Sequence, residues 1–231
     1  MPLPSGVQEF AVSNPAPPTP VLYLHGFASS PDSTKARYFG ERLGAHGVTL
    51  ATPDFNEPDF STLTMSRMLE QLASAIAAAG GRVTLVGSSL GAALAVLGAA
   101  RFGDAVERLV LLAPAVMFAR PGHSLLPPER IVEWERRGAL PFFHYAYNEE
   151  RLLSFEFYRD SLQHDPFVSE FAQPTLIFQG LRDTVVDVRS VEVFARGRTN
   201  VTLSLLDDDH QLLASLPTMW DSVEDFLGLL D

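Results

Sequence analysis

Short apolar runs alternate with amphipathic stretches along most of this 231-residue sequence. VLYL (21–24), VTLV (83–86) and LVLLA (109–113) are nearly continuous apolar runs, which is typical of strands buried on both faces. The stretches between such runs have helical spacing and stop at glycines such as Gly47 and Gly80. Strands joined through helices run parallel, and the helices cover both faces of the sheet. The sequence therefore predicts an α/β fold with a mostly parallel central sheet.

The same reading divides the chain into three parts. Residues 1–20 are rich in proline and are expected to form an arm, with one short edge strand around 7–12. Residues 21–114 and 172–231 are expected to form the α/β core. The expected strands are 21–27, 48–55, 82–88, 106–114, 174–180 and 201–208, and the expected helices are 33–47, 61–80 (with Ser61 as N-cap), 90–103, 190–197 and 217–230. Between them, residues 115–171 are aromatic, interrupted by proline and mostly helical in character, which predicts a helical cap insertion that includes 127–138 and 148–162.

Charge and composition exclude several classes of function. The formal net charge is −11, which disfavours binding to nucleic acid or to an anionic membrane surface. The chain has no cysteine, so disulfides, thiolate metal sites and a cysteine nucleophile are excluded. No HExxH pattern or close histidine pair points to a metal enzyme. Neither a signal peptide nor a membrane-length apolar run is visible, so we expect a cytoplasmic protein, monomeric or homodimeric, without cofactor or metal.

The sequence Gly87-Ser88-Ser89-Leu90-Gly91 lies between an expected strand and an expected helix. In an open parallel sheet, ligands bind beyond the carboxyl ends of the strands. A G-x-S-x-G sequence at such an end makes a sharp turn that exposes the middle serine. Ser89 is therefore the candidate nucleophile and Ser88 the spacer. The alternative is an ordinary glycine-rich turn in which the serine caps the helix.

A serine hydroxyl needs a base to remove its proton and an acid to orient that base. After a strand–serine–helix turn, these partners follow in the order acid, then histidine. His210 is the histidine that follows the last expected strand, so it is the candidate base. Asp183 follows the preceding strand and is the favoured acid, with Asp187 as the rival that could instead cap the next helix. The three aspartates 207–209 are less favoured, because they adjoin His210 on one loop and are expected to form a solvated turn.

Negative charge on a reacting carbonyl oxygen requires hydrogen-bond donors. One candidate is the backbone N–H of Leu90, directly after the serine. The other is the backbone N–H of Phe27 in the sequence YLHGF, where Gly26 allows the turn. His25 is expected to brace this loop by hydrogen bonding. An ordinary strand-ending turn is the alternative for this segment.

These stretches together resemble the α/β-hydrolase family. LYLHGFASSPDSTKA, LVGSSLGA, GLRDTVVD and DDDH match its motif order, and the opening, the VGSSLG turn and the VEDFLGL ending are similar to a group of small bacterial serine esterases. The resemblance extends over nearly the whole chain from Val21 and implies Ser89 as nucleophile, Asp183 as acid, His210 as base, and the N–H groups of Phe27 and Leu90 as oxyanion donors. Two features depart from the family: Asp209 stands where a glycine commonly precedes the histidine, and the insertion is larger than in the most compact members.

The resulting hypothesis is a serine hydrolase that cleaves a carboxylic ester or thioester of a small molecule through an acyl-enzyme. Acyl transfer, perhydrolysis, and amide or carbon–carbon cleavage remain alternatives that use the same triad. A non-catalytic binding protein on the same fold is less favoured, because all three triad positions are filled. The aromatic side chains of the insertion could form an apolar pocket roof or simply the core of a small cap. Arg136, Arg137 and Arg151 are expected to be solvated.

Overall fold

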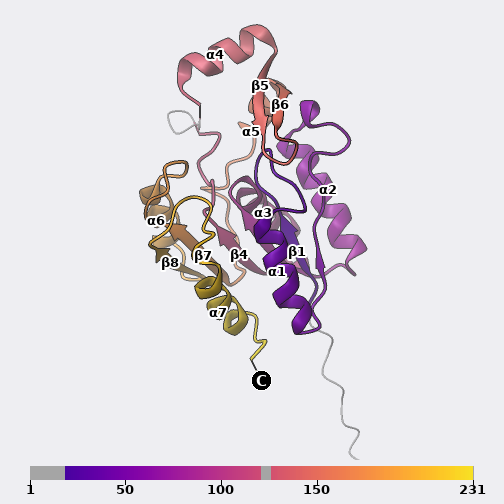
Figure 1. Ribbon diagram of the computed structural model, residues 1–231, viewed down its shortest axis with the longest axis vertical. Coiled ribbons are helices and arrows are strands. Elements are labelled where there is room, and N and C mark those ends of the chain that lie inside the picture. The colour runs from indigo at the N-terminus through magenta and orange to yellow at the C-terminus, as the bar shows by residue number, and fades with distance from the viewer. Residues whose placement is uncertain (1–18, 121–125, 231) are drawn as a thin grey trace, which may run out of the picture.

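A computed structural model describes residues 19–120 and 126–230 of the chain. Within these residues the main feature is a six-stranded parallel sheet with the strand order β2-β1-β3-β4-β7-β8 (Figure 1). Its strands are β1 (Val21–Leu24), β2 (Leu50–Ala51), β3 (Val83–Ser88), β4 (Val106–Leu112), β7 (Thr175–Gly180) and β8 (Val201–Leu206). Strands β1, β3 and β7 are buried along their whole length, as their continuous apolar sequences predict. The expected α/β fold with a parallel central sheet is confirmed.

Helices cover both faces of the sheet. On one face, α1 (Thr34–Ala45) and α7 (Leu216–Phe226) pack over a core that contains Phe39, Trp220 and the side chains of β1 and β4 that point to this face of the sheet. On the other face, α2 (Met65–Ala78), α3 (Leu90–Phe102) and α6 (Val188–Arg196) enclose the larger core. Buried alanines along α3 let this helix lie close to the sheet.

Two expected boundaries within the core are wrong. Strand β2 is limited to two residues, because residues 52–59 leave the sheet edge and make turns. Helix α2 begins after Thr64, whose hydroxyl accepts a hydrogen bond from the Arg67 N–H, and Ser61 instead lies in a 3₁₀ helix (Phe60–Thr62) capped by Asp59. Ser61 and Thr64 can each serve as an N-cap. The buried Phe60 lies in the 3₁₀ helix, and α2 starts after that helix, at Met65.

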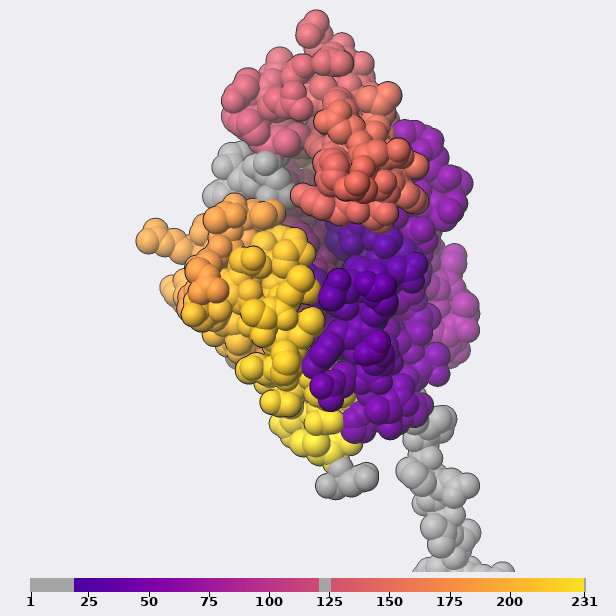
Figure 2. Space-filling model, in the orientation of Figure 1, coloured from indigo at the N-terminus to yellow at the C-terminus, as the bar shows by residue number. Residues whose placement is uncertain are grey.

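Between β4 and β7 the chain forms α4 (Pro128–Arg137), β5 (Ala139–His144), β6 (Glu149–Ser154) and α5 (Glu156–Ser161). Residues 115–171 of this segment are the expected insertion, and we keep that name for them; in Figure 2 its salmon-coloured surface forms one end of the molecule. The expectation of helix across 149–154 is wrong, because this segment pairs antiparallel with β5. The pairing buries Leu140 and Leu153, and this tertiary contact overrides the helical preference of a Glu-Glu-Arg-Leu-Leu sequence.

The N-terminal arm with its expected edge strand falls almost entirely in 1–18, and residues 121–125 of the expected insertion also lie outside the described part of the chain.

Candidate active site

Ser89 lies at the apex of the turn from β3 to α3, with a positive φ of 54°. A non-glycine residue rarely adopts this conformation, and residues that do are concentrated at functional sites. The turn is held by the Ser89 N–H, which donates to the Leu112 carbonyl at 2.9 Å, and by the Ser89 carbonyl, which accepts from the Ala92 and Ala115 N–H groups. Ser88 is buried, whereas Ser89 is partly exposed. The turn thus presents the second serine at the surface of the core.

The two glycines around Ser89 are required by close backbone contacts. A Cβ at Gly87 would lie 2.5 Å from the Gly91 carbonyl oxygen, and a Cβ at Gly91 would lie 2.0 Å from the Leu24 carbonyl oxygen. Both distances are shorter than any van der Waals contact, so only glycine allows α3 to fold back across its own strand and against β1.

Asp183 and His210 form a hydrogen-bonded pair beyond the carboxyl ends of β7 and β8. His210 Nδ1 lies 2.8 Å from Asp183 Oδ2, and the Asp183 side chain is fully buried while that of His210 is 15% exposed. A carboxylate can only accept, so the imidazole donates from Nδ1, and in the neutral ring Nε2 then keeps a lone pair. The pair therefore has the tautomer that a general base requires.

Three further donors hold the Asp183 carboxylate. Its Oδ1 accepts from the N–H groups of Val185 and Val186, both at 2.8 Å, and its Oδ2 also accepts from Gln179 Nε2 at 2.9 Å. Burial alone would raise the pKa of Asp183, but the hydrogen bonds from His210 and from the two N–H groups lower it overall. The carboxylate is therefore ionised and fixed in orientation at neutral pH.

Gln179 is a site residue that the sequence reading missed. It is fully buried near the end of β7, directly after the three apolar residues Leu176, Ile177 and Phe178. An amide that directly follows three apolar residues of the strand, next to the glycine where the strand ends, was the available signal.

The other aspartates near this pair have different partners. Asp187 caps α6, accepting a hydrogen bond from the Arg189 N–H. Asp207 is exposed and pairs with Arg182. Asp208 is buried and accepts from the N–H groups of Asp209 and Ser215, so the expectation that all three acids form a solvated turn is wrong for this residue. Its carboxylate instead closes the loop that precedes α7.

The strand register aligns the segments that carry these residues. Ser88 pairs with Leu112, Leu112 with Phe178, and Phe178 with Ser204. The residues that follow each strand therefore start from one edge of the sheet. At Gly180, a Cβ would lie 2.4 Å from the Asp209 carbonyl oxygen, so the loop that bears His210 passes directly over the end of β7.

The loop after β1 lies against the serine turn. A Cβ on Gly26 would lie 3.5 Å from the Ser89 Cβ, and the Phe27 N–H donates to no other described residue. Leu90 is the first residue of α3, so its N–H has no partner within the helix. His25 is buried and bonds to the Gly26 carbonyl through Nδ1 at 2.9 Å, in the bracing position expected from the sequence.

Lys35 is a second residue that the sequence reading did not single out. It is 8% exposed on α1, and its Nζ donates to the carbonyl of Gln211 at 2.9 Å. Burial lowers the pKa of Lys35 to about 8, although the carboxylates of Asp209, Asp183 and Asp208 act in the opposite direction. A lysine on an amphipathic helix is usually solvated, so nothing in the sequence marked this one.

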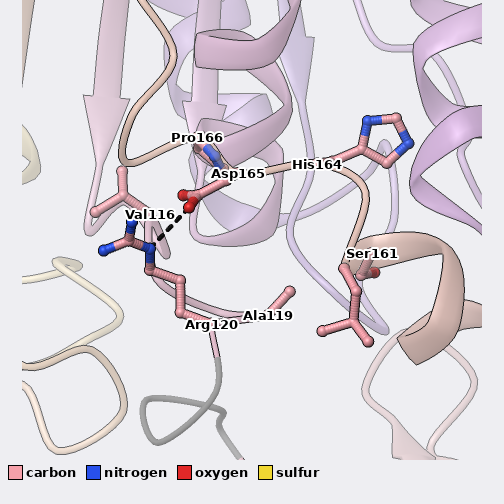
Figure 3. A pocket seen from close by; sticks show the side chains of 8 residues that line it. Val116, Ala119, Arg120, Ser161, His164, Asp165 and Pro166 are labelled. Carbon is pink, nitrogen blue, oxygen red and sulfur yellow. Dashed lines mark hydrogen bonds and ion pairs between the residues drawn. The ribbon is translucent and has the colours of Figure 1, made fainter.

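A pocket of about 580 Å³ lies where the insertion leaves and re-enters the core (Figure 3). Its floor begins next to the serine turn, because the Ala115 N–H donates to the Ser89 carbonyl and Val116 lines the pocket. Arg120 and Asp165 form an ion pair of 2.8 Å across it. The lining residues are Val116, Ala119, Arg120, Ser161, Leu162, His164, Asp165 and Pro166. The volume fits a small organic ligand, and the lining is half polar rather than wholly apolar.

Most aromatic side chains of the insertion pack on one another. Trp134 is buried, with its ring centroid 5.0 Å from that of Phe142 and 6.4 Å from that of Phe157. These rings form a core within the insertion. This favours the interpretation of the aromatic residues as the core of a small cap over their interpretation as the roof of an apolar pocket. The insertion's arginines lie at the surface, where Arg137 pairs with Glu133 and Arg151 with Glu149.

The described residues contain no cluster of three or more histidine, aspartate or glutamate side chains that could hold a metal ion. Among the helices described, none combines the length and the apolar character needed to cross a bilayer.

Several solved structures share this fold. Est1E from Butyrivibrio proteoclasticus, solved with ferulic acid bound, aligns with a TM-score of 0.78 and 22% identity over 93% of this chain and 90% of its own. Mouse α/β-hydrolase domain-containing protein 10 aligns with a TM-score of 0.75 and 22% identity over 91% and 90%. The monoacylglycerol lipase of Paleococcus ferrophilus gives 0.73 and 13% over 91% and 95%. At these identities the likeness establishes the α/β-hydrolase fold.

Sequence comparison places the chain more narrowly. No curated protein matches it significantly. A family model does match residues 20–226, which span the core and the insertion together. The chain therefore belongs to the uncharacterised protein family UPF0227.

Proposed function

We propose that this protein is a serine hydrolase that cleaves a carboxylic ester or thioester through an acyl-enzyme on Ser89. The observation that carries the proposal is the hydrogen-bonded Asp183–His210 pair, which in the neutral ring leaves Nε2 free to accept a proton, on the sheet edge where Ser89 occupies its left-handed turn. Est1E has the same fold and binds ferulic acid, a carboxylic acid of the kind that ester hydrolysis releases.

In the proposed reaction, Ser89 Oγ attacks the carbonyl carbon while His210 Nε2 takes the hydroxyl proton. Asp183 stabilises the imidazolium that forms, and the N–H groups of Phe27 and Leu90 bind the oxyanion. The imidazolium then gives its proton to the departing alcohol or thiol as the carbon–oxygen or carbon–sulfur bond breaks. A water molecule, deprotonated by the same imidazole, attacks the acyl-enzyme, and collapse of the second intermediate returns the proton to Ser89.

The test compares two adjacent serines. Ser89→Ala is expected to lower kcat/KM on p-nitrophenyl esters by at least about 10³-fold and to abolish labelling by a fluorophosphonate probe. Ser88→Ala removes the buried neighbour and is expected to keep the labelling. A panel of increasing acyl length, with an acyl-CoA, then identifies the preferred substrate. Hydrolysis that survives in Ser89→Ala at the wild-type rate would contradict the mechanism.

A further inference from the structure

Both ends of the loop formed by residues 25–29, which we call the oxyanion loop, are hydrogen-bonded to other parts of the protein. At its start, the Phe55 N–H donates to His25 Nε2 at 3.1 Å, and the same nitrogen lies 3.4 Å from Asp54 Oδ1. His25 Nδ1 lies 2.9 Å from the Gly26 carbonyl oxygen. His25, 3% exposed, is thus held on both sides of its ring directly before Gly26 and Phe27.

The middle of the loop is held by the insertion. Ala28 has a φ of 51°, which is unfavourable for any residue with a Cβ and needs support from surrounding contacts. Its carbonyl accepts a hydrogen bond of 2.9 Å from the N–H of Tyr145, the residue that follows β5. The strained position next to Phe27 therefore depends on where β5 ends.

The far end of the loop is held through Asn56. Its Nδ2 donates to the Ser29 carbonyl at 2.9 Å and to Asp54 Oδ1 at 2.8 Å. Both partners can only accept, which fixes the orientation of the amide and turns its Oδ1 toward His144 Nε2 at 3.0 Å. Asn56 is 5% exposed, so solvent cannot readily replace these bonds.

His144 is the last residue of β5 and is fully buried. Because Asn56 Oδ1 only accepts, His144 carries its proton on Nε2, and its buried Nδ1 has no partner among the described residues. A second proton on Nδ1 would have nothing to bond to, so the ring is held neutral. Burial lowers the pKa of His144; the charges around it are Arg151 and His25, which act in the same direction, and Asp54 and Glu149, which oppose.

Ring contacts join the same two segments. The Phe27 ring lies 5.5 Å from that of Phe142 on β5 and 5.6 Å from that of Phe157 on α5. The His144 ring meets Phe60 edge-on at 4.8 Å, and Phe60 also contacts Phe27. The side chain and the backbone of the oxyanion loop are thus both in contact with the insertion.

From this network we propose that His144 is a positioning residue: through Asn56 and the end of β5, the insertion holds the oxyanion loop in the one backbone conformation that places the Phe27 N–H for catalysis. The proposal rests on the function proposed above, because it assigns the Phe27 N–H to the oxyanion. It makes the insertion part of the catalytic geometry, in addition to any part it has in binding substrate. A ligand that shifts β5 would then alter the rate of the chemical step.

The test separates positioning from packing. His144→Phe keeps a ring beside Phe60 but removes the Nε2 donor, and His144→Gln returns an amide donor near the same place. We expect His144→Phe to lower kcat for p-nitrophenyl acetate by about 10-fold or more, with KM changed less than threefold. The inhibition constant of an aryl trifluoromethyl ketone, which forms an oxyanion on Ser89, should weaken by the same factor. His144→Gln should recover part of both, and Asn56→Ala should behave like His144→Phe.

Phe143→Ala, on the exposed face of the same strand, is the matched control and should resemble the wild type. A folded His144→Phe whose kcat and ketone affinity stay within twofold of wild type would overturn the positioning role. So would loss of folding in both His144→Phe and Asn56→Ala, because the contacts would then stabilise the fold in general. Absence of fluorophosphonate labelling of wild-type Ser89 would instead contradict the proposed function itself.

Discussion

A buried lysine beside an acid-rich loop links the ionisation of one residue to the stability of the fold. Lys35 Nζ holds the carbonyl of Gln211, the residue after His210, and its carboxylate neighbours do not fully offset the cost of burial. The pKa of Lys35 falls from its ordinary 10.5 to about 8. Between these values the unfolded chain binds the proton and the folded protein does not, so stability rises with pH across this window.

We expect the free energy of unfolding of the wild type, relative to Lys35→Met, to increase by up to ~3 kcal/mol between pH 8 and 10.5, since each pKa unit corresponds to about 1.4 kcal/mol. Urea unfolding of both proteins at four pH values across this range measures the difference. Subtracting the unfolding free energy of Lys35→Met from that of the wild type cancels the contributions of the other titrating groups, which both proteins share. If the difference in unfolding free energy between the two proteins stayed constant across this pH range, the pKa of Lys35 would not be lowered in the folded protein.

At the scale of elements, the insertion is fastened to α2 through one carboxylate. Asp160 on α5 accepts the Ser66 N–H at 2.8 Å and the Ser66 hydroxyl at 2.5 Å, and His164 Nε2 lies 2.9 Å from the same hydroxyl. Ser66 lies in the first turn of α2, where free N–H groups and the helix dipole favour a negative charge. One side chain therefore caps a core helix and anchors the insertion.

Asp160→Ala is expected to destabilise the protein by about 1–3 kcal/mol, because it leaves the N–H and the hydroxyl of Ser66 without their charged acceptor. Hydrogen–deuterium exchange should speed up in α5 before it does so in α3. Glu156→Ala on the same helix is the control: its carboxylate is exposed and, in the described part of the chain, forms an ion pair with Arg159 alone, so its effect should stay within about 0.5 kcal/mol. Equal effects of the two variants would argue against the anchor.

At the scale of the whole molecule, the sheet separates two cores, and the buried aromatic side chains of the insertion among the described residues belong to one of them. The core beneath α1 and α7 contains Phe39, fully buried, with its ring 6.2 Å from that of Trp220. The insertion's Trp134 and Phe157 belong to the other core, as does Phe60 beneath them. Substitutions in the core beneath α1 and α7 should therefore change stability without altering the contacts between the insertion and the oxyanion loop.

Phe39→Ala is expected to destabilise the protein by about 3–5 kcal/mol through the cavity it leaves. The activity of the molecules that remain folded, normalised by active-site titration with the fluorophosphonate, should stay within twofold of wild type. Urea unfolding and p-nitrophenyl ester hydrolysis measure the two quantities. Glu41→Ala, exposed on the same helix, is the neutral control. A parallel fall in activity per folded molecule would contradict the separation of the two cores.

Local signals in the sequence were enough for the α/β architecture and for the Ser89 turn. Continuous apolar strands, helical spacing and glycines at fixed offsets depend on neighbouring residues, so they can be read from a window of the chain. The same holds for His25, whose bracing position next to Gly26 follows from its place in the YLHGF segment. Asp183 and His210 were assigned from their order in the chain and their places after expected strands. The distance of 2.8 Å between His210 Nδ1 and Asp183 Oδ2 is seen only in the folded protein.

The remaining features depend on contacts between distant segments. Residues 149–154 become a strand because β5 pairs with them. Gln179, Lys35 and His144 form their hydrogen bonds with residues of loops that the fold brings next to them. Burial and hydrogen bonding set what these polar side chains do, and neither is a property of the local sequence. The sequence by itself therefore determined the order of strands and helices and the shape of the serine turn, whereas the tertiary structure decided which polar groups hold Asp183, the loop that carries His210, and residues 25–29.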